Sequence, residues 1–155
     1  MVGCSIDFRI APEHPYPAQV QDANYAIRWL KANAGRFNGD VSQMGVLGRS
    51  SGGHTALLLA MRPLDERYAA LDGPADVDAR VAYAMTLWPV LDSYGRCLLA
   101  KETGSEHLVS ASKGYFLTEE AMREGNPQDI LERGESVVLA PTQVLHGSAD
   151  TNVPL

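Results

Sequence analysis

The chain has 155 residues, with 45% hydrophobic and 21% charged residues and a formal net charge of −6. This length is typical of one globular domain, and an acidic balance without a basic cluster argues against a nucleic-acid-binding protein. Because the sequence has no apolar run of about 18 residues, we expect no membrane-spanning helix. No signal peptide is visible at the N-terminus, and the compartment stays open, with the cytoplasm favoured.

Cysteine and histidine usage predicts no metal site. Two cysteines do not make a disulfide framework, and Cys4, within an apolar run, is expected in the core. The four histidines are scattered without zinc-ligand spacing: His14, His54, His107 and His146. We therefore expect neither a metal nor an organic cofactor.

The beginning of the chain predicts a strand, a loop and a helix. Val2–Phe8 is expected to form a strand, and the three prolines within residues 11–17 then predict an ordered loop. Apolar residues recur at helical spacing from Ala18 to Ala34, and Gly35 is the expected C-terminal cap of this helix.

The most informative motif follows this helix. Gly48-Arg49-Ser50-Ser51-Gly52 has Gly-x-Ser-x-Gly spacing and lies between a predicted strand, Met44–Leu47, and a predicted helix, His54–Met61. A strand, a tight turn and a helix in this order are typical of a nucleophile elbow, which exposes an activated serine to an acyl carbon. We expect Gly48 and Gly52 to be small because their side chains would collide. The alternative is a Gly/Ser-rich turn without chemistry.

Two further strands follow in the second half of the chain. Val81–Trp88 and Thr142–His146 read as strands, and Gly147–Asp150 turns out of the second of them. Residues 91–136 are expected to be an inserted cap or lid, with a helix that Thr118 caps. Short apolar strands separated by helical segments predict a parallel α/β sheet, whose functional residues gather at the carboxyl ends of the strands.

Four stretches carry a resemblance to a known family: Ser5–Pro17, Gly48–His54, Leu87–Asp92 and His146–Pro154. They resemble the α/β-hydrolase superfamily, and within it the hormone-sensitive-lipase-like and acetyl esterase group. The resemblance implies one partial catalytic domain over residues 1–155, with a mostly parallel sheet flanked by helices. The first three strands and the last strand of the family would be absent, so the chain looks like a central fragment.

The resemblance also implies roles for individual residues. Ser50 resembles the nucleophile and Asp150 the acid that orients a histidine, in the chain order of this superfamily. The backbone N–H of Ser51 is the expected oxyanion donor. Asp150 could instead be a turn aspartate that bonds its own backbone, and Asp92 is the second candidate for the acid.

None of the four histidines fits the general base, which in this superfamily follows the acid in sequence. Five residues remain after Asp150, and the His-Gly-Gly segment that supplies other oxyanion donors in the family precedes the strand at which this chain begins. We expect His14, His54 and His146 to be structural and His107 to lie in the lid. The chain by itself is therefore expected to show little or no activity.

The sequence thus predicts a serine carboxylic-ester hydrolase with a small-molecule ester as substrate. The alternatives are an amide or peptide hydrolase of the same fold and a truncated, non-catalytic remnant. Aromatic residues of a substrate pocket would be Trp88, Tyr94, Tyr115 and Phe116, which could equally be ordinary core residues. Without the family's third strand, a slot of about 10 Å would separate Val2–Phe8 from Met44–Leu47, unless the two pair directly or a homo-oligomer or another chain completes the sheet.

Overall fold

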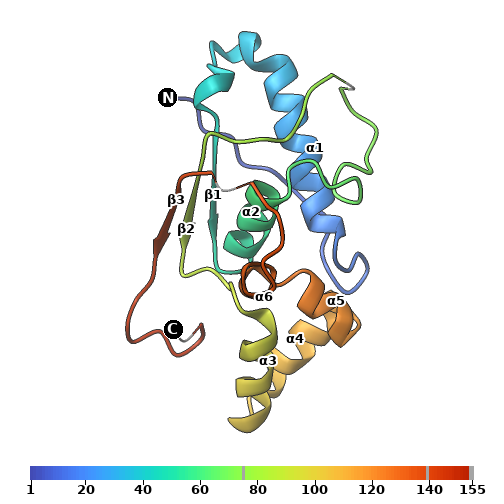
Figure 1. Ribbon diagram of the computed structural model, residues 1–155, viewed down its shortest axis with the longest axis vertical. Coiled ribbons are helices and arrows are strands. Elements are labelled where there is room, and N and C mark those ends of the chain that lie inside the picture. The colour runs from blue at the N-terminus through green and yellow to red at the C-terminus, as the bar shows by residue number, and fades with distance from the viewer. Residues whose placement is uncertain (75, 139, 154–155) are drawn as a thin grey trace.

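The computed structural model has a three-stranded parallel sheet as its centre (Figure 1). It describes residues 1–74, 76–138 and 140–153, so Pro154 of the resemblance lies outside the described residues. The strands lie in the order β1 (Gly45–Arg49), β2 (Tyr83–Leu87) and β3 (Thr142–Leu145). The three predicted strands from residue 44 onward are confirmed to within two residues at each end.

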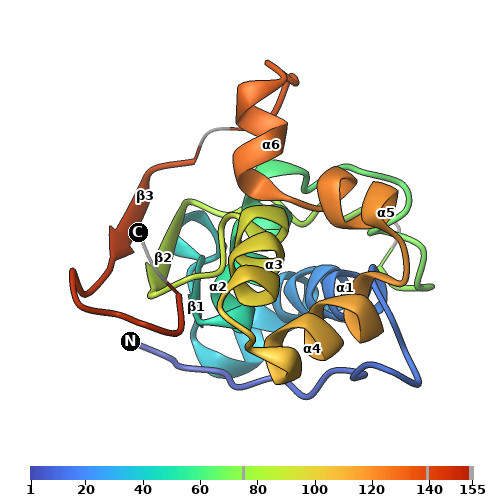
Figure 2. The same ribbon diagram turned by 90° about the horizontal axis from the view of Figure 1, so that it is seen from below.

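Two helices cover one face of this sheet (Figures 1 and 2). They are α1 (Ala18–Asn33) and α2 (Ser51–Met61), and α1 reaches β1 through two 3-10 turns, Ala34–Phe37 and Val41–Gln43. Successive side chains of a strand alternate between the two faces. Val46 accordingly packs against the core formed by both helices, whereas its neighbour Leu47 is 66% exposed on the opposite face.

Four helices connect β2 to β3 and lie beyond the carboxyl ends of the strands (Figure 1). They are α3 (Ser93–Glu102), α4 (Glu106–Phe116), α5 (Glu119–Glu124) and α6 (Pro127–Glu132). The predicted cap of α5 is confirmed, because Thr118 Oγ1 accepts a hydrogen bond of 3.1 Å from the N–H of Ala121. Their role as a lid stays a prediction. Within the described residues, no helix is long and apolar enough to cross a membrane.

The expected strand at Val2–Phe8 is wrong. This segment has no regular secondary structure, and β1 has β2 as its partner and no pairing with the N-terminal segment. The segment instead runs beside α1, where Arg9 binds both carboxylate oxygens of Asp22. Outside the sheet, Cys4 is exposed rather than part of the core. A second chain along the free edge of β1 stays a prediction.

The expected cap at Gly35 is also wrong. α1 continues directly into the first 3-10 turn, and Gly35 lies inside that turn. The left-handed residue that ends the segment is Asn38, with φ 52°, and its N–H bonds back to the carbonyls of the turn. Asparagine tolerates this conformation, so the chain reverses three residues later than the glycine suggests.

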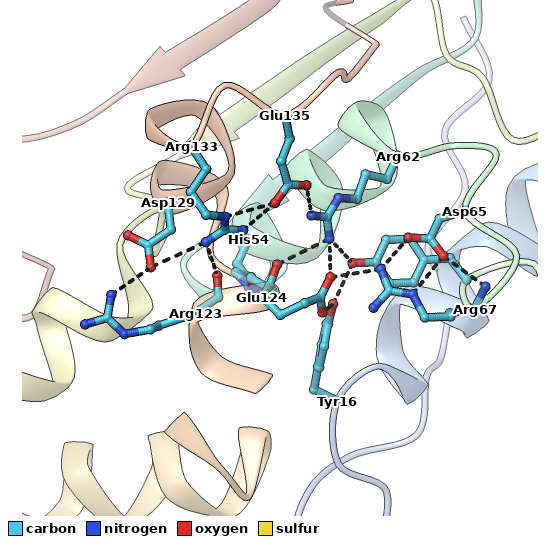
Figure 3. A network of polar contacts seen from close by, with 12 residues as sticks. Tyr16, His54, Arg62, Asp65, Arg67, Arg123, Glu124, Asp129, Arg133 and Glu135 are labelled. Atoms are coloured by element: carbon cyan, nitrogen blue, oxygen red, sulfur yellow. Dashed lines mark hydrogen bonds and ion pairs between the residues drawn. The ribbon is translucent and has the colours of Figure 1, made fainter. Parts of the chain in front are cut away.

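A network of ion pairs and hydrogen bonds joins the end of α2 to the inserted helices (Figure 3). Arg62, directly after α2, binds the carboxylates of Glu124 and Glu135. Glu124 also accepts a hydrogen bond of 2.7 Å from the hydroxyl of Tyr16, in the proline-rich loop. Burial opposes ionisation of Glu124, but hydrogen bonds from Arg67 and Tyr16 lower its pKa overall. The network therefore connects three segments that are distant in sequence.

Candidate active site

The carboxyl ends of the strands bring the predicted site residues to one edge of the sheet. The N–H of Ser50 donates a hydrogen bond of 2.9 Å to the carbonyl of Leu87, and the N–H of Trp88 donates one of 2.7 Å to that of Leu145. Each of these bonds joins a residue just after one strand to the end of the next strand. The turn at Ser50 and the turn after β3 consequently lie at the same edge.

Ser50 lies at the tip of the turn between β1 and α2. Its backbone has φ 51° and ψ −124°, a conformation that costs free energy in any residue but glycine. The surrounding backbone holds it there, because the carbonyl of Ser50 accepts hydrogen bonds from Gly53, His54 and Val90. Its side chain does not cap the helix, so the hydroxyl is left for other contacts.

The glycines near Ser50 differ in whether the structure leaves room for a side chain. A Cβ on Gly48 would lie 2.1 Å from the carbonyl oxygen of Gly52, and one on Gly53 would lie 2.6 Å from Cβ of Pro89. A Cβ on Gly52 would meet nothing within 4 Å. Gly48 must therefore be small, as expected, but the expectation that Gly52 must be small is wrong. It is the backbone of Gly52, not its Cβ position, that lies close to Gly48.

The start of α2 presents free backbone donors beside Ser50. Ser51 is the first residue of the helix, where N–H groups have no intrahelical acceptor and the helix dipole is positive. An N–H in this position can stabilise an oxyanion that forms at an acyl carbon attacked by Ser50.

Asp150 makes the contacts of a turn aspartate, and its role as the acid stays a prediction. Its N–H closes the turn by donating to Gly147, and its Oδ1 accepts hydrogen bonds of 2.9 Å from the N–H groups of Asn152 and Val153. These two backbone donors lower the pKa of Asp150. Oδ2 has no hydrogen bond with the described residues, so one oxygen of an ionised carboxylate stays available.

Asp92, the second candidate for the acid, is engaged elsewhere. Its Oδ1 accepts hydrogen bonds of 2.8 Å from the N–H of Gly95 and from the side chain of Asn126. The first caps α3, and the second ties α3 to the start of α6. These contacts favour a structural role for Asp92.

Only one histidine of the described residues lies near Asp150. His146 Nε2 is 4.0 Å from Asp150 Oδ2 but is directed at the carbonyl of Val153, 2.6 Å away. The sequence reasoning missed this proximity, which the spacing of four residues around the turn could have indicated. His14 and His107 are exposed. No histidine nitrogen forms a hydrogen bond with Ser50 Oγ in the part of the chain that the structure describes.

His54 packs beneath the inserted helices, as expected. Its ring is 3% exposed and stands edge-on to Tyr115 and Phe116. Nε2 lies 2.7 Å from the carbonyl oxygen of Gly125, at the end of α5. Burial lowers the pKa of His54 to about 4, against a smaller opposing effect of the bond to Gly125. The neutral ring therefore donates this hydrogen bond.

A cavity of about 380 Å³ adjoins the turn that carries Ser50. Ser51, His54 and Val90 form one part of its wall, and Tyr115 and Phe116 form another. Two of the four predicted pocket aromatics thus line the cavity. The others lie outside its lining: Trp88 is 42% exposed after β2, and Tyr94 stacks on the guanidinium of Arg123.

The parallel sheet and the likeness to solved structures define an α/β-hydrolase fold. An acetyl ester-xyloside bifunctional hydrolase from Caldicellulosiruptor lactoaceticus has a TM-score of 0.69 at 24% identity, covering 96% of this chain and 50% of its own. An esterase from Pyrobaculum calidifontis has a TM-score of 0.64 at 22% identity, covering 89% and 44%. At this identity the likeness shows the fold.

The chain belongs to the BD-FAE family, which matches residues 1–155. It is 29% identical to Esterase LipC of Mycobacterium tuberculosis over 153 residues, which are 97% of this chain and 37% of LipC. It is 39% identical to Esterase LipI of the same organism over 84 residues, 54% of this chain and 25% of LipI. The chain thus spans well under half the length of these curated relatives.

The two glycines of the motif are expected to respond in opposite ways to the same substitution. Gly48→Ala should lower the free energy of unfolding by at least about 2 kcal/mol, because the new methyl group meets rigid backbone. Gly52→Ala should leave it unchanged or raise it by up to about 1 kcal/mol, because alanine favours the helix. Urea denaturation of the two variants measures both effects. Equal destabilisation by both would contradict the asymmetry.

His54 is expected to make stability depend on pH. Its pKa is about 4 when folded and about 6.5 when unfolded, so between these values only the unfolded chain binds the proton. Stability due to His54 is complete above pH 6.5 and falls, by up to about 3 kcal/mol, as the pH drops toward 4. The control is His54→Gln, which keeps a donor but does not titrate. Denaturation curves of the two proteins that shift in parallel between pH 7 and 4.5 would contradict the assignment.

Proposed function

We propose that the protein is a serine carboxylic-ester hydrolase that works through an acyl-serine intermediate. The observation that carries the proposal is the backbone of Ser50, held at φ 51° between a parallel strand and the start of a buried helix. In this strained turn the hydroxyl does not cap the helix, and the free N–H groups at the start of α2 are adjacent in sequence, as nucleophilic attack requires. The names of the curated relatives, which are esterases, support an ester as the substrate.

The reaction begins with attack of Ser50 Oγ on the ester carbonyl carbon. A histidine accepts the hydroxyl proton and passes it to the leaving alcohol, while the N–H of Ser51 donates to the oxyanion. The same histidine then activates a water molecule, which hydrolyses the acyl-serine. Asp150 orients this histidine through its free Oδ2.

We place that histidine between the turns that carry Ser50 and Asp150. The two residues follow β1 and β3, which are separated by β2, so their strands are about 10 Å apart. A histidine between the two turns would accept a hydrogen bond from Ser50 and donate one to Asp150. We infer that the histidine comes from sequence outside residues 1–155, since the relatives are much longer than this chain.

Two alternatives remain distinguishable by assay. An amide hydrolase would use the same residues, and parallel rates on a p-nitrophenyl ester and an arylformamide rank the two reactions. A non-catalytic protein would turn over neither compound. The position of the buried His54, away from Ser50 Oγ, favours little or no activity of residues 1–155 alone.

Ser50→Ala is expected to reduce ester hydrolysis by several powers of ten, because it removes the attacking oxygen. The measurement is kcat for p-nitrophenyl acetate, with the protein expressed together with any sequence that flanks residues 1–155. Ser51→Ala is the matched control, since it removes the neighbouring hydroxyl and keeps the backbone N–H. Its kcat should stay within about tenfold of the unchanged protein.

Two results would contradict the assignment. One is hydrolysis by Ser50→Ala at the rate of the unchanged protein. The other is a loss of activity in Ser51→Ala as large as that in Ser50→Ala.

A further inference from the structure

An arginine that forms no ion pair with the described residues lines the cavity beside the turn of Ser50. Arg96 extends from α3 into the cavity wall. Its Nε donates a hydrogen bond of 2.8 Å to the carbonyl of Asn152, and Nη2 donates one of 3.0 Å to Asn152 Oδ1. Both acceptors are neutral. Among the described residues, no carboxylate lies in ion-pair contact with Arg96.

The guanidinium keeps donors free for a ligand. An arginine has five N–H donors in one plane, and the contacts to Asn152 use Nε and one position of Nη2. Nη1 has no hydrogen bond with the residues that the structure describes. Burial lowers the pKa of Arg96 against smaller opposing effects of Asp150 and Cys97, but the group remains charged.

The rest of the cavity wall is mostly apolar, but it adds hydroxyl groups and no carboxylate from the described residues. Besides Ser51, three serines line it: Ser93 from α3, and Ser110 and Ser112 from α4. None of the described residues in its lining is an aspartate or glutamate, although the chain has a net charge of −6. The charge of the nearby Asp150 raises the pKa of Arg96, and two backbone N–H groups already donate hydrogen bonds to this carboxylate. The cavity is thus a neutral-to-positive site in an acidic protein.

We propose that this cavity binds a carboxylate carried by the ester substrate, with Arg96 as the specificity-determining residue. The inference rests on the proposed function, because it places the ester group at Ser50 beside Ser51 and Val90. A carboxylate matches the planar donors of a guanidinium, and the serine hydroxyls can satisfy its remaining lone pairs. A volume of about 380 Å³ accommodates a short monoester of a dicarboxylic acid or a small acetylated hydroxy acid.

Binding tests the cavity without any need for turnover. The Ser50→Ala protein is titrated with monomethyl succinate and with methyl 4-methylpentanoate, which replaces the carboxylate by an isopropyl group of similar size, and NMR detects binding. We expect monomethyl succinate to bind more tightly. We expect Arg96→Met to weaken its binding about ten- to hundredfold, since charge-assisted hydrogen bonds are lost. Equal binding of both esters, or no effect of Arg96→Met, would overturn the proposal.

Measurements of turnover then distinguish a role of Arg96 in selecting the substrate from a role in positioning other residues. We compare kcat/KM for monomethyl succinate and methyl 4-methylpentanoate, and for acetoxyacetate and isobutyl acetate, where the carboxylate is on the alcohol half. For one of the two pairs, Arg96→Met should lower the ratio of kcat/KM for the anionic ester to kcat/KM for the neutral ester at least about tenfold. That pair identifies whether the acyl half or the alcohol half of the substrate carries the carboxylate. Arg96→Lys should retain part of the ratio.

A purely positioning role for Arg96 would give a different result. If Arg96 only holds the turn of Asp150, Arg96→Met should lower kcat/KM equally for anionic and neutral esters, and this would overturn the proposal. Asn152→Ala is the matched control, because it removes one acceptor of Arg96 and should leave the ratio unchanged. A protein that binds monomethyl succinate through Arg96 but hydrolyses no ester would contradict the proposed function and retain the inferred site.

Discussion

The contact between Gly48 and the backbone of Gly52 is the constraint on which the site depends. It lets β1 turn directly into α2, with the Cβ position of Gly48 occupied by a carbonyl oxygen of the helix. Within this tight turn Ser50 takes a positive φ, and the first N–H groups of α2 follow directly after it. The proposed nucleophile and the proposed oxyanion donor thus depend on one backbone contact, and both come from residues adjacent in sequence.

Both ends of helix α2 contact the inserted helices. His54, near its start, bonds the carbonyl of Gly125, and Arg62, just after its end, binds Glu124 (Figure 3). Two neighbouring residues at the end of α5 are therefore held by both ends of the helix that carries the turn. α5 in turn packs through Met122 against α3 and α4, which line the cavity. Arg96 reaches the cavity wall from α3.

The sequence predicted those elements that interactions between neighbouring residues determine. The helical periodicity of Ala18–Asn33, the cap at Thr118 and the strand-turn-helix around Ser50 each depend on neighbouring residues, and each was predictable. Val2–Phe8 was not, because a strand needs a partner from elsewhere in the chain. The proximity of His146 to Asp150 and the place of Arg96 in the cavity arise from packing between separate elements. The roles of Ser50 and Asp150 came from the family resemblance and stay proposals.

The central claim is that Ser50 is the nucleophile, and covalent mapping tests it most directly. The protein, expressed with any flanking sequence, is treated with a fluorophosphonate, cleaved after Arg49 and analysed by mass spectrometry with fragmentation of the peptide that begins at Ser50. The account predicts one adduct, on Ser50 and not on the adjacent Ser51. An adduct on another residue, or none in a protein that hydrolyses esters, would contradict it.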